Sequence, residues 1–107
     1  MKFDFVETEI FEKELKRLAK KYKSLKLDIE NLKTEIEDNP NIGINLGDGF
    51  KKIRISITSK GKGKSGGGRV VTQTVIISKV EQKIIMVLLW DKSEIENVDI
   101  KILKKLI

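Results

Sequence analysis

The stretch Phe50–Arg69, FKKIRISITSKGKGKSGGGR, decides how this chain folds, because a strand pattern in it runs directly into a glycine-rich loop. Successive side chains of a strand point to opposite faces of the sheet. The alternation from Phe50 to Ile57 therefore predicts one face with core residues and one with polar residues. The core face carries Ile53, Ile55 and Ile57, and the polar face carries Lys52, Arg54 and Ser56.

Positive charge is concentrated around this stretch. The chain carries 22 basic and 16 acidic residues, for a net charge of +6. No acidic residue lies between Asp48 and Glu81, where eight basic ones occur: Lys51, Lys52, Arg54, Lys60, Lys62, Lys64, Arg69 and Lys79. The remainder, with 14 basic and 16 acidic residues, is close to neutral. Lysines that guard a sheet edge against aggregation account for one or two of these cations. Eight of them predict a phosphate-binding surface that meets nucleic acid.

The loop Thr58–Gly68 contains five glycines and three lysines. Glycine costs entropy to order and neighbouring lysines repel each other, so we expect the loop to be mobile until a polyanion binds. Gly63, Lys64 and Ser65 match the end of a Walker A phosphate loop. However, Thr58 stands where the first glycine belongs and the loop leads into a strand, which argues against nucleotide hydrolysis.

The residues before this stretch predict a short strand and two helices. Lys2–Val6 alternates as a half-buried strand does. Thr8 is placed to cap a helix with one apolar stripe, and Ser24 to cap a second helix that stops at Asn39 and Pro40. The range 41–49 reads as a loop. The two stripes consist of Phe11, Leu15, Leu18, Ala19 and Tyr22, and of Leu25, Ile29, Leu32 and Ile36.

The residues after it predict two more strands and a short helix. Arg69–Ser78 is rich in β-branched residues, and the apolar run Ile84–Trp90 suits a central strand that is buried on both faces. Ser93 and Glu96 have the spacing of a capping box for a short helical tail. Strands grouped after helices predict an α+β domain, a small antiparallel sheet packed against the N-terminal helical pair, with a short C-terminal helix. At 107 residues, the chain 1–107 has the size of one domain.

The composition of the chain limits the catalytic groups and metal ligands that it can offer. The chain has no cysteine and no histidine, which excludes disulfides, zinc sites that use these residues, thiol nucleophiles and a histidine base. The N-terminal sequence MKFDFVETEI lacks the features of a signal peptide, so we expect a cytoplasmic protein. The longest apolar run is far too short to cross a bilayer, so we expect no membrane partner.

The order of these elements, the segment GKGKSGGGRVV from Gly61 to Val71, and DKSE from Asp91 to Glu94 resemble the RelE/ParE superfamily of toxins from type II toxin–antitoxin systems. Within it, the chain is most similar to the HigB-like branch. The resemblance implies one RelE-like toxin domain over 1–107 that binds a cognate antitoxin and cleaves messenger RNA on the ribosome. It implies no metal and no other cofactor.

The resemblance also implies which residues act. Arg54, Lys64, Arg69 and Lys92 match the positions of the family's catalytic basic residues. Lys52, Lys60, Lys62 and Trp90 would bind RNA, Trp90 by stacking on a base. In such metal-free cleavage a ribose 2′-hydroxyl attacks the adjacent phosphate, and preorganised cations stabilise the charge that develops on its oxygens.

One departure from the family pattern leaves alternatives open. Relatives often carry a tyrosine near the end of the last strand, where this chain has Trp90. Asp91 is a candidate substitute acid or base, although Asp91–Glu94 also reads as a strand end followed by a helix cap. The alternatives to an mRNA endonuclease are a non-enzymatic ParE-like toxin that inhibits gyrase, and an inactive relative that binds RNA. The same fold serves these functions, so fold alone does not choose between them.

Overall fold

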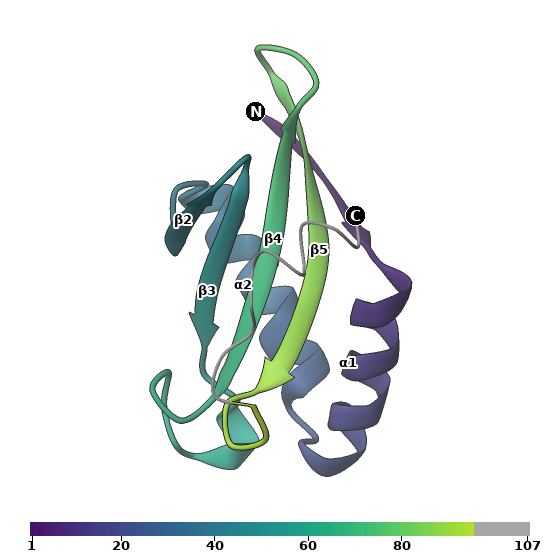
Figure 1. Ribbon diagram of the computed structural model, residues 1–107, viewed down its shortest axis with the longest axis vertical. Helices are drawn as coiled ribbons and strands as arrows, with labels where there is room; N and C mark the ends of the chain where they lie inside the picture. The colour runs from purple at the N-terminus through teal and green to yellow at the C-terminus, as the bar shows by residue number, and fades with distance from the viewer. Residues whose placement is uncertain (96–107) are drawn as a thin grey trace.

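A computed structural model describes residues 1–95 of the chain (Figure 1). The predicted short C-terminal helix and its capping partner Glu96 lie outside the described residues. The described elements, in chain order, are β1 (Lys2–Glu7), α1 (Glu9–Lys21), α2 (Leu25–Asp38), β2 (Ile44–Gly47), β3 (Phe50–Ile55), the 3₁₀ turn η1 (Thr58–Lys60), β4 (Gly68–Ile76) and β5 (Glu81–Asp91).

The strands form one five-stranded sheet in the order β1-β5-β4-β3-β2. The α+β class predicted from the sequence is confirmed, with a difference in the sheet. Strands β2 to β5 pair antiparallel, as expected, but β1 runs parallel to β5 from the Lys2–Glu81 pair to the Glu7–Met86 pair. The sheet is therefore mixed. The parallel pair arises because the helical hairpin between β1 and the rest of the sheet returns the chain to the same end, as a crossover does.

A second difference concerns the range 41–49, which the sequence predicts as a loop. Ile44–Gly47 forms the edge strand β2, and its residues Ile44 and Asn45 pair with Lys52 and Lys51 of β3. Glycine, asparagine and aspartate in this range are typical of turns. Here these residues also flank a short edge strand, and the sequence pattern does not reveal that strand.

The two helices begin as their sequences suggest, but only one is capped as expected. Thr8 Oγ1 accepts a hydrogen bond from Phe11 N at 3.0 Å, which is the geometry of an N-cap. Ser24 precedes α2 without making a side-chain cap. Its hydroxyl instead donates a hydrogen bond to the Asp28 carboxylate at 2.8 Å. Ser24 is therefore part of the hydrogen-bond network around Asp28, which is described below.

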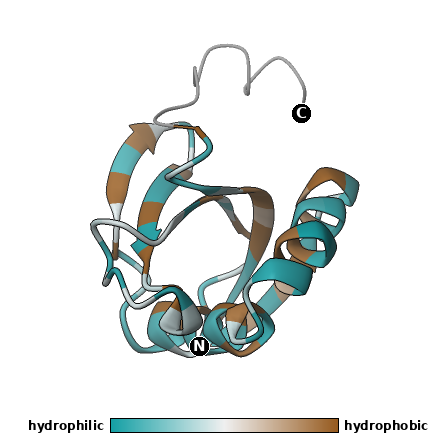
Figure 2. Ribbon diagram, turned by 90° about the horizontal axis from the view of Figure 1, so that it is seen from below, coloured by the Kyte–Doolittle hydropathy of each residue, from teal (hydrophilic) through white to brown (hydrophobic). Residues whose placement is uncertain are grey.

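The core has two parts, one on each face of the sheet. In Figure 1, α2 lies behind the strands and α1 lies beside β5. The larger part joins the helices to the sheet through residues such as Phe11, Ile29 and Ile55. The smaller part lies on the opposite face and consists of Phe50, Val71, Val87 and Trp90. The view from below in Figure 2 shows hydrophobic and hydrophilic segments alternating along the elements, the pattern of one-sided burial.

Strand β5 lies between β1 and β4 and is the central strand that the sequence predicts. Its residues Met86, Val87, Leu89 and Trp90 are buried. They include residues of both core parts, so β5 is covered on both faces. Neither α1 nor α2 is long and apolar enough to span a membrane.

Candidate nucleic-acid interface

The register of the sheet brings three of the sequence-predicted site residues into one row. Arg54 of β3 pairs with Arg69 of β4, and Arg69 pairs with Trp90 of β5. Residues paired directly across strands lie on the same face. This is the face opposite the larger core, because the neighbours Ile53 and Ile55 face the helices. Two arginines that are far apart in the sequence are thus adjacent.

The two arginines differ in their surroundings. Arg54 is exposed, whereas only 5% of Arg69 is exposed. The guanidinium of Arg69 donates to the main-chain carbonyls of Lys64 at 2.9 Å, Gly68 at 2.9 Å and Ser65 at 3.2 Å. Burial, and after it the charge of Arg54, lower the pKa of Arg69 from its ordinary value. Arg69 of β4 therefore stabilises the conformation of the loop that carries Lys64, through hydrogen bonds to the main chain of the loop.

The glycines of the loop permit its tight path. A Cβ atom added at Gly67 would lie 2.2 Å from the carbonyl oxygen of Ile55, so no larger residue fits there without moving the backbone. Gly61 and Gly63 have φ angles of +73° and +61°, which glycine adopts without steric cost. The loop is close-packed where it joins β4 and open where Lys62 and Lys64 project.

The start of the loop is attached to α2 through Asp28, a buried carboxylate. Asp28 accepts from Thr58 N at 3.0 Å, from Thr58 Oγ1 at 2.7 Å and from Ser24 Oγ at 2.8 Å. Ser59 N adds a bond to Ser24 Oγ at 2.8 Å. These bonds and those of Arg69 attach the loop at both ends. That the part between them is mobile until a polyanion binds stays a prediction.

A second buried carboxylate, Asp91, joins the end of β5 to the loop and to α1. It is fully buried. Its Oδ2 accepts from Tyr22 Oη at 2.7 Å, and its Oδ1 accepts from Lys60 Nζ at 2.6 Å. Oδ1 also accepts from the main-chain N of Ser93 at 2.9 Å and from Ser93 Oγ at 2.7 Å. Asp91 thus has no face open to a substrate.

The electrostatics of Asp91 follow from these bonds. Burial alone would raise the pKa of Asp91, but the hydrogen bonds from Lys60, Ser93 and Tyr22 outweigh burial and hold this pKa well below its usual range. Next to it, the guanidinium of Arg17 binds Glu94 through two bonds, at 2.8 and 3.0 Å, and lowers the pKa of Glu94. The turn after β5 is therefore attached to α1 at two points.

The cations whose side chains make no such hydrogen bonds or ion pairs are the ones that are available to a ligand. The side chains of Arg54, Lys62 and Lys64 are exposed and make no hydrogen bond or ion pair within residues 1–95. Lys92 is half-buried, and its main-chain N donates to Gly67 O at 3.1 Å, which places it beside the loop. Lys52 is half-buried on the same face as Arg54 and pairs with Val71, but it differs from the three exposed cations because it has a partner of its own.

Apart from Lys52, which lies half-buried on β3, the sequence-predicted site residues separate into two groups. Arg54, Lys62, Lys64 and Lys92 present charge at one end of the sheet, and we call them the basic cluster. Arg69, Lys60 and Trp90 support it: Arg69 binds loop carbonyls, Lys60 binds Asp91, and Trp90, 3% exposed, packs in the smaller part of the core. A buried Trp90 has no open ring face on which a base could stack.

Sequence reasoning missed Asp28 and the role of Tyr22. A signal for Asp28 was present, because it lies three residues after Leu25 and four before Leu32, on the apolar stripe of α2. A carboxylate on a buried face requires partners there. No comparable signal exists for the bond between Tyr22 and Asp91, because it joins residues 69 positions apart.

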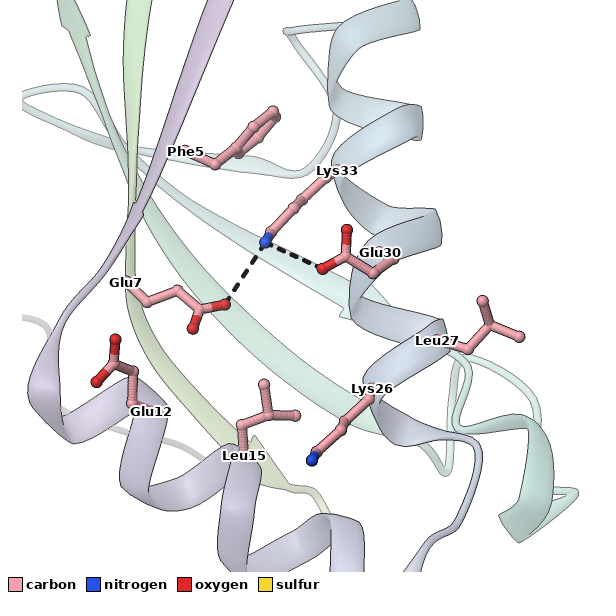
Figure 3. A pocket seen from close by; sticks show the side chains of 8 residues that line it. All are labelled: Phe5, Glu7, Glu12, Leu15, Lys26, Leu27, Glu30 and Lys33. Atoms are coloured by element: carbon pink, nitrogen blue, oxygen red, sulfur yellow. Dashed lines mark hydrogen bonds and ion pairs between the residues drawn. The ribbon is translucent and has the colours of Figure 1, made fainter.

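A larger hollow lies elsewhere, between α1, α2 and β1 (Figure 3). It has a volume of about 650 Å³, with Phe5 and Leu15 among its apolar lining residues. Lys33 reaches into it and lies 3.2 Å from Glu30 and 3.6 Å from Glu7. Acidic and basic groups alternate around this hollow, so it lacks the one-signed charge that attracts a polyanion.

Comparison with known families gives one result. A family model described as the RelE toxin of the RelE/RelB toxin–antitoxin system matches residues 8–106. No curated protein matches the chain. The matched range covers all the elements above except β1, so the basic cluster and its supporting residues all fall within it.

Proposed function

Because the chain belongs to the family of RelE toxins from RelE/RelB toxin–antitoxin systems, we propose that it is a ribosome-dependent mRNA endonuclease. As a member of this family the protein is a toxin, and its partner is a cognate antitoxin. The proposal places it in the cytoplasm with the ribosomes. The observation that carries it is the basic cluster, whose cations Arg54, Lys62 and Lys64 are exposed and unpaired among residues 1–95 on an otherwise tightly bonded loop and strand.

In the proposed reaction, the ribose 2′-oxygen forms a bond to the adjacent phosphorus and the bond from phosphorus to the 5′-oxygen breaks. The products are a 2′,3′-cyclic phosphate and a free 5′-hydroxyl. One proton leaves the 2′-hydroxyl and one reaches the 5′-oxygen. Arg54 binds two phosphate oxygens with its planar guanidinium, and Lys62 and Lys64 attract the strand. Arg69 binds the main-chain carbonyl of Lys64 and so fixes the loop that carries this lysine.

Proton transfer falls to a lysine of the basic cluster, Lys64 or Lys92. Asp91, the candidate acid or base from sequence, is unsuited because its carboxylate is fully buried and accepts four hydrogen bonds. Trp90 carries no hydroxyl that could replace the tyrosine of many relatives.

The test is cleavage of a defined message on programmed ribosomes, with cuts mapped by primer extension. We expect cuts in the ribosomal A site by the wild type, and a loss of about 100-fold or more in rate for Arg54→Ala and Lys64→Ala. Lys16→Ala is the matched control, because Lys16 is exposed on α1 and is not a member of the basic cluster. An intact message with the wild type overturns the proposal, and growth arrest without cleavage would then point to gyrase inhibition.

A further inference from the structure

A small cavity lies beside the basic cluster, at the exposed edge of β3. Pairing of β2 with β3 stops at Lys52, so within residues 1–95 no strand covers the end of β3 on that side. The cavity of about 140 Å³ fills the angle between this edge, α2 and the loop. Arg54 and Lys64, the two proposed phosphate ligands, are among the residues that line it.

The other walls provide an apolar floor and a polar edge. Leu32 and Ile55, 3% and 5% exposed, are core residues that also line the cavity. Asn31 and Glu35 line it from α2, and their spacing of four residues places them on one helix face. At roughly 30 Å³ per water, the cavity holds about four or five waters, so its volume admits a small molecular group.

The polar groups of the cavity differ in what they can still bind. Asp28 lines it, but its carboxylate is already occupied by Ser24 and Thr58. The side chains of Asn31 and Glu35 make no hydrogen bond within the part of the chain that the structure describes. Glu35 is therefore the carboxylate of this cavity that is available to a ligand.

We propose that this cavity binds one unstacked base of the RNA, adjacent to the phosphate at Arg54 and Lys64, and that Glu35 makes it select guanine. The inference rests on the proposed function. The apolar floor matches the face of a base, and the polar edge matches its hydrogen-bonding edge. Guanine alone among the four bases presents two neighbouring N–H donors, N1–H and the N2 amino group, to the two oxygens of a carboxylate. Asn31 adds a donor for O6.

The charge of the cavity supports this assignment. A free carboxylate repels the phosphate backbone, but Arg54 and Lys64 offset it at the rim. The base is thus the part of the nucleotide that approaches Glu35, while the phosphate stays with the cations. A purely electrostatic site would need no carboxylate at this place and would show no preference among bases.

Two measurements test the proposal. The first is cleavage on ribosomes of messages that carry each of the four bases at the positions flanking the cut. The second is binding of short RNAs with the same four bases and a 2′-O-methyl group that prevents cleavage, followed by fluorescence anisotropy. One bidentate contact discriminates by about 1–3 kcal/mol, so we expect a preference for guanine of about 5- to 150-fold.

Glu35→Gln should abolish this preference and leave cleavage and binding with the other three bases within about twofold of the wild type. Glu37→Gln is the matched control, because Glu37 is also exposed on α2 and is absent from the cavity. Cleavage with the same preference in the wild type and Glu35→Gln overturns the cavity assignment alone. A wild type that cuts no message but binds guanine-containing RNA through Glu35 upholds the cavity and overturns the proposed function.

Discussion

Asp91 is the single residue on which the attachment of the loop to β5 and α1 depends most. It is fully buried, and the Lys60 side chain that binds it is 11% exposed. Replacing Asp91 with asparagine keeps the shape but leaves the Lys60 ammonium without a counter-charge. Removing one partner of a buried ion pair costs about 3–5 kcal/mol. We expect Asp91→Asn to lower the free energy of unfolding by about this amount in urea titrations at pH 7.

The Asp91 carboxylate also makes the stability of the protein depend on pH, in a direction that its lowered pKa determines. Its folded-state pKa lies below that of an unfolded aspartate, about 3.9, so its contribution is fully present above that pH. The contribution is lost as the pH falls through the folded-state pKa. The urea midpoint of the wild type should therefore fall between pH 5 and pH 2 by more than that of Asp91→Asn. Equal pH dependence of the two proteins would contradict this account of Asp91.

Arg69 can be tested by separating its charge from its geometry. Arg69→Lys keeps the charge, but an ammonium cannot reproduce three bonds to the carbonyls of Lys64, Ser65 and Gly68. We expect a loss of about 1–3 kcal/mol in stability. Cleavage should fall well below the wild-type rate, because the loop that carries Lys64 loses its attachment to Arg69, while RNA affinity stays closer to that of the wild type. Cleavage by Arg69→Lys at the wild-type rate would mean that only the charge of residue 69 matters.

At the scale of elements, the loop depends on close packing at Gly67. In Gly67→Ala the new Cβ would meet the Ile55 carbonyl at 2.2 Å, whereas at Gly63 nothing lies within 4 Å. Overpacking costs about 3 kcal/mol when the backbone must move. Gly63→Ala carries only the left-handed φ penalty of about 1 kcal/mol. Thermal or urea unfolding of the pair should show this order, and equal costs would mean that the loop shifts freely.

The elements also show how far sequence reasoning reaches. Alternation and helical stripes predict β1, β3 and both helices, because each of these elements has one buried side. The β-branched run predicts β4, and the continuous apolar run predicts β5, which is covered on both faces. These patterns do not predict β2, since its turn-forming residues outweigh its short pattern. Nor do they fix the parallel pairing of β1, because alternation is the same in either strand direction. The buried carboxylates form their hydrogen bonds through tertiary contacts, which sequence patterns do not show. For this reason the sequence indicated a strand end at Asp91 but did not predict its bond to Tyr22.

At the scale of the whole molecule, the charge distribution separates a basic face from a nearly neutral remainder. Arg54, Lys62 and Lys64 lie at one end of the sheet, while the cations of α1 lie on a helix whose acidic residues accompany them. The logarithm of affinity for single-stranded nucleic acid falls with the logarithm of salt, by about 0.7 for each phosphate contact. If the binding site is localised, the slope of this salt dependence therefore falls only when the cations of that site are removed.

The last prediction uses this difference, with a short RNA titrated by fluorescence anisotropy across a salt series. Replacing Arg54, Lys62 and Lys64 together with alanine should lower the steepness of the salt dependence by about two. Replacing Lys16, Lys20 and Lys23 removes the same charge from exposed positions in and just after α1, and should leave the steepness unchanged. Equal losses in the two triple variants would mean that RNA senses only the net charge. A loss confined to the first shows that the sheet end, and not the protein as a whole, is the polyanion site.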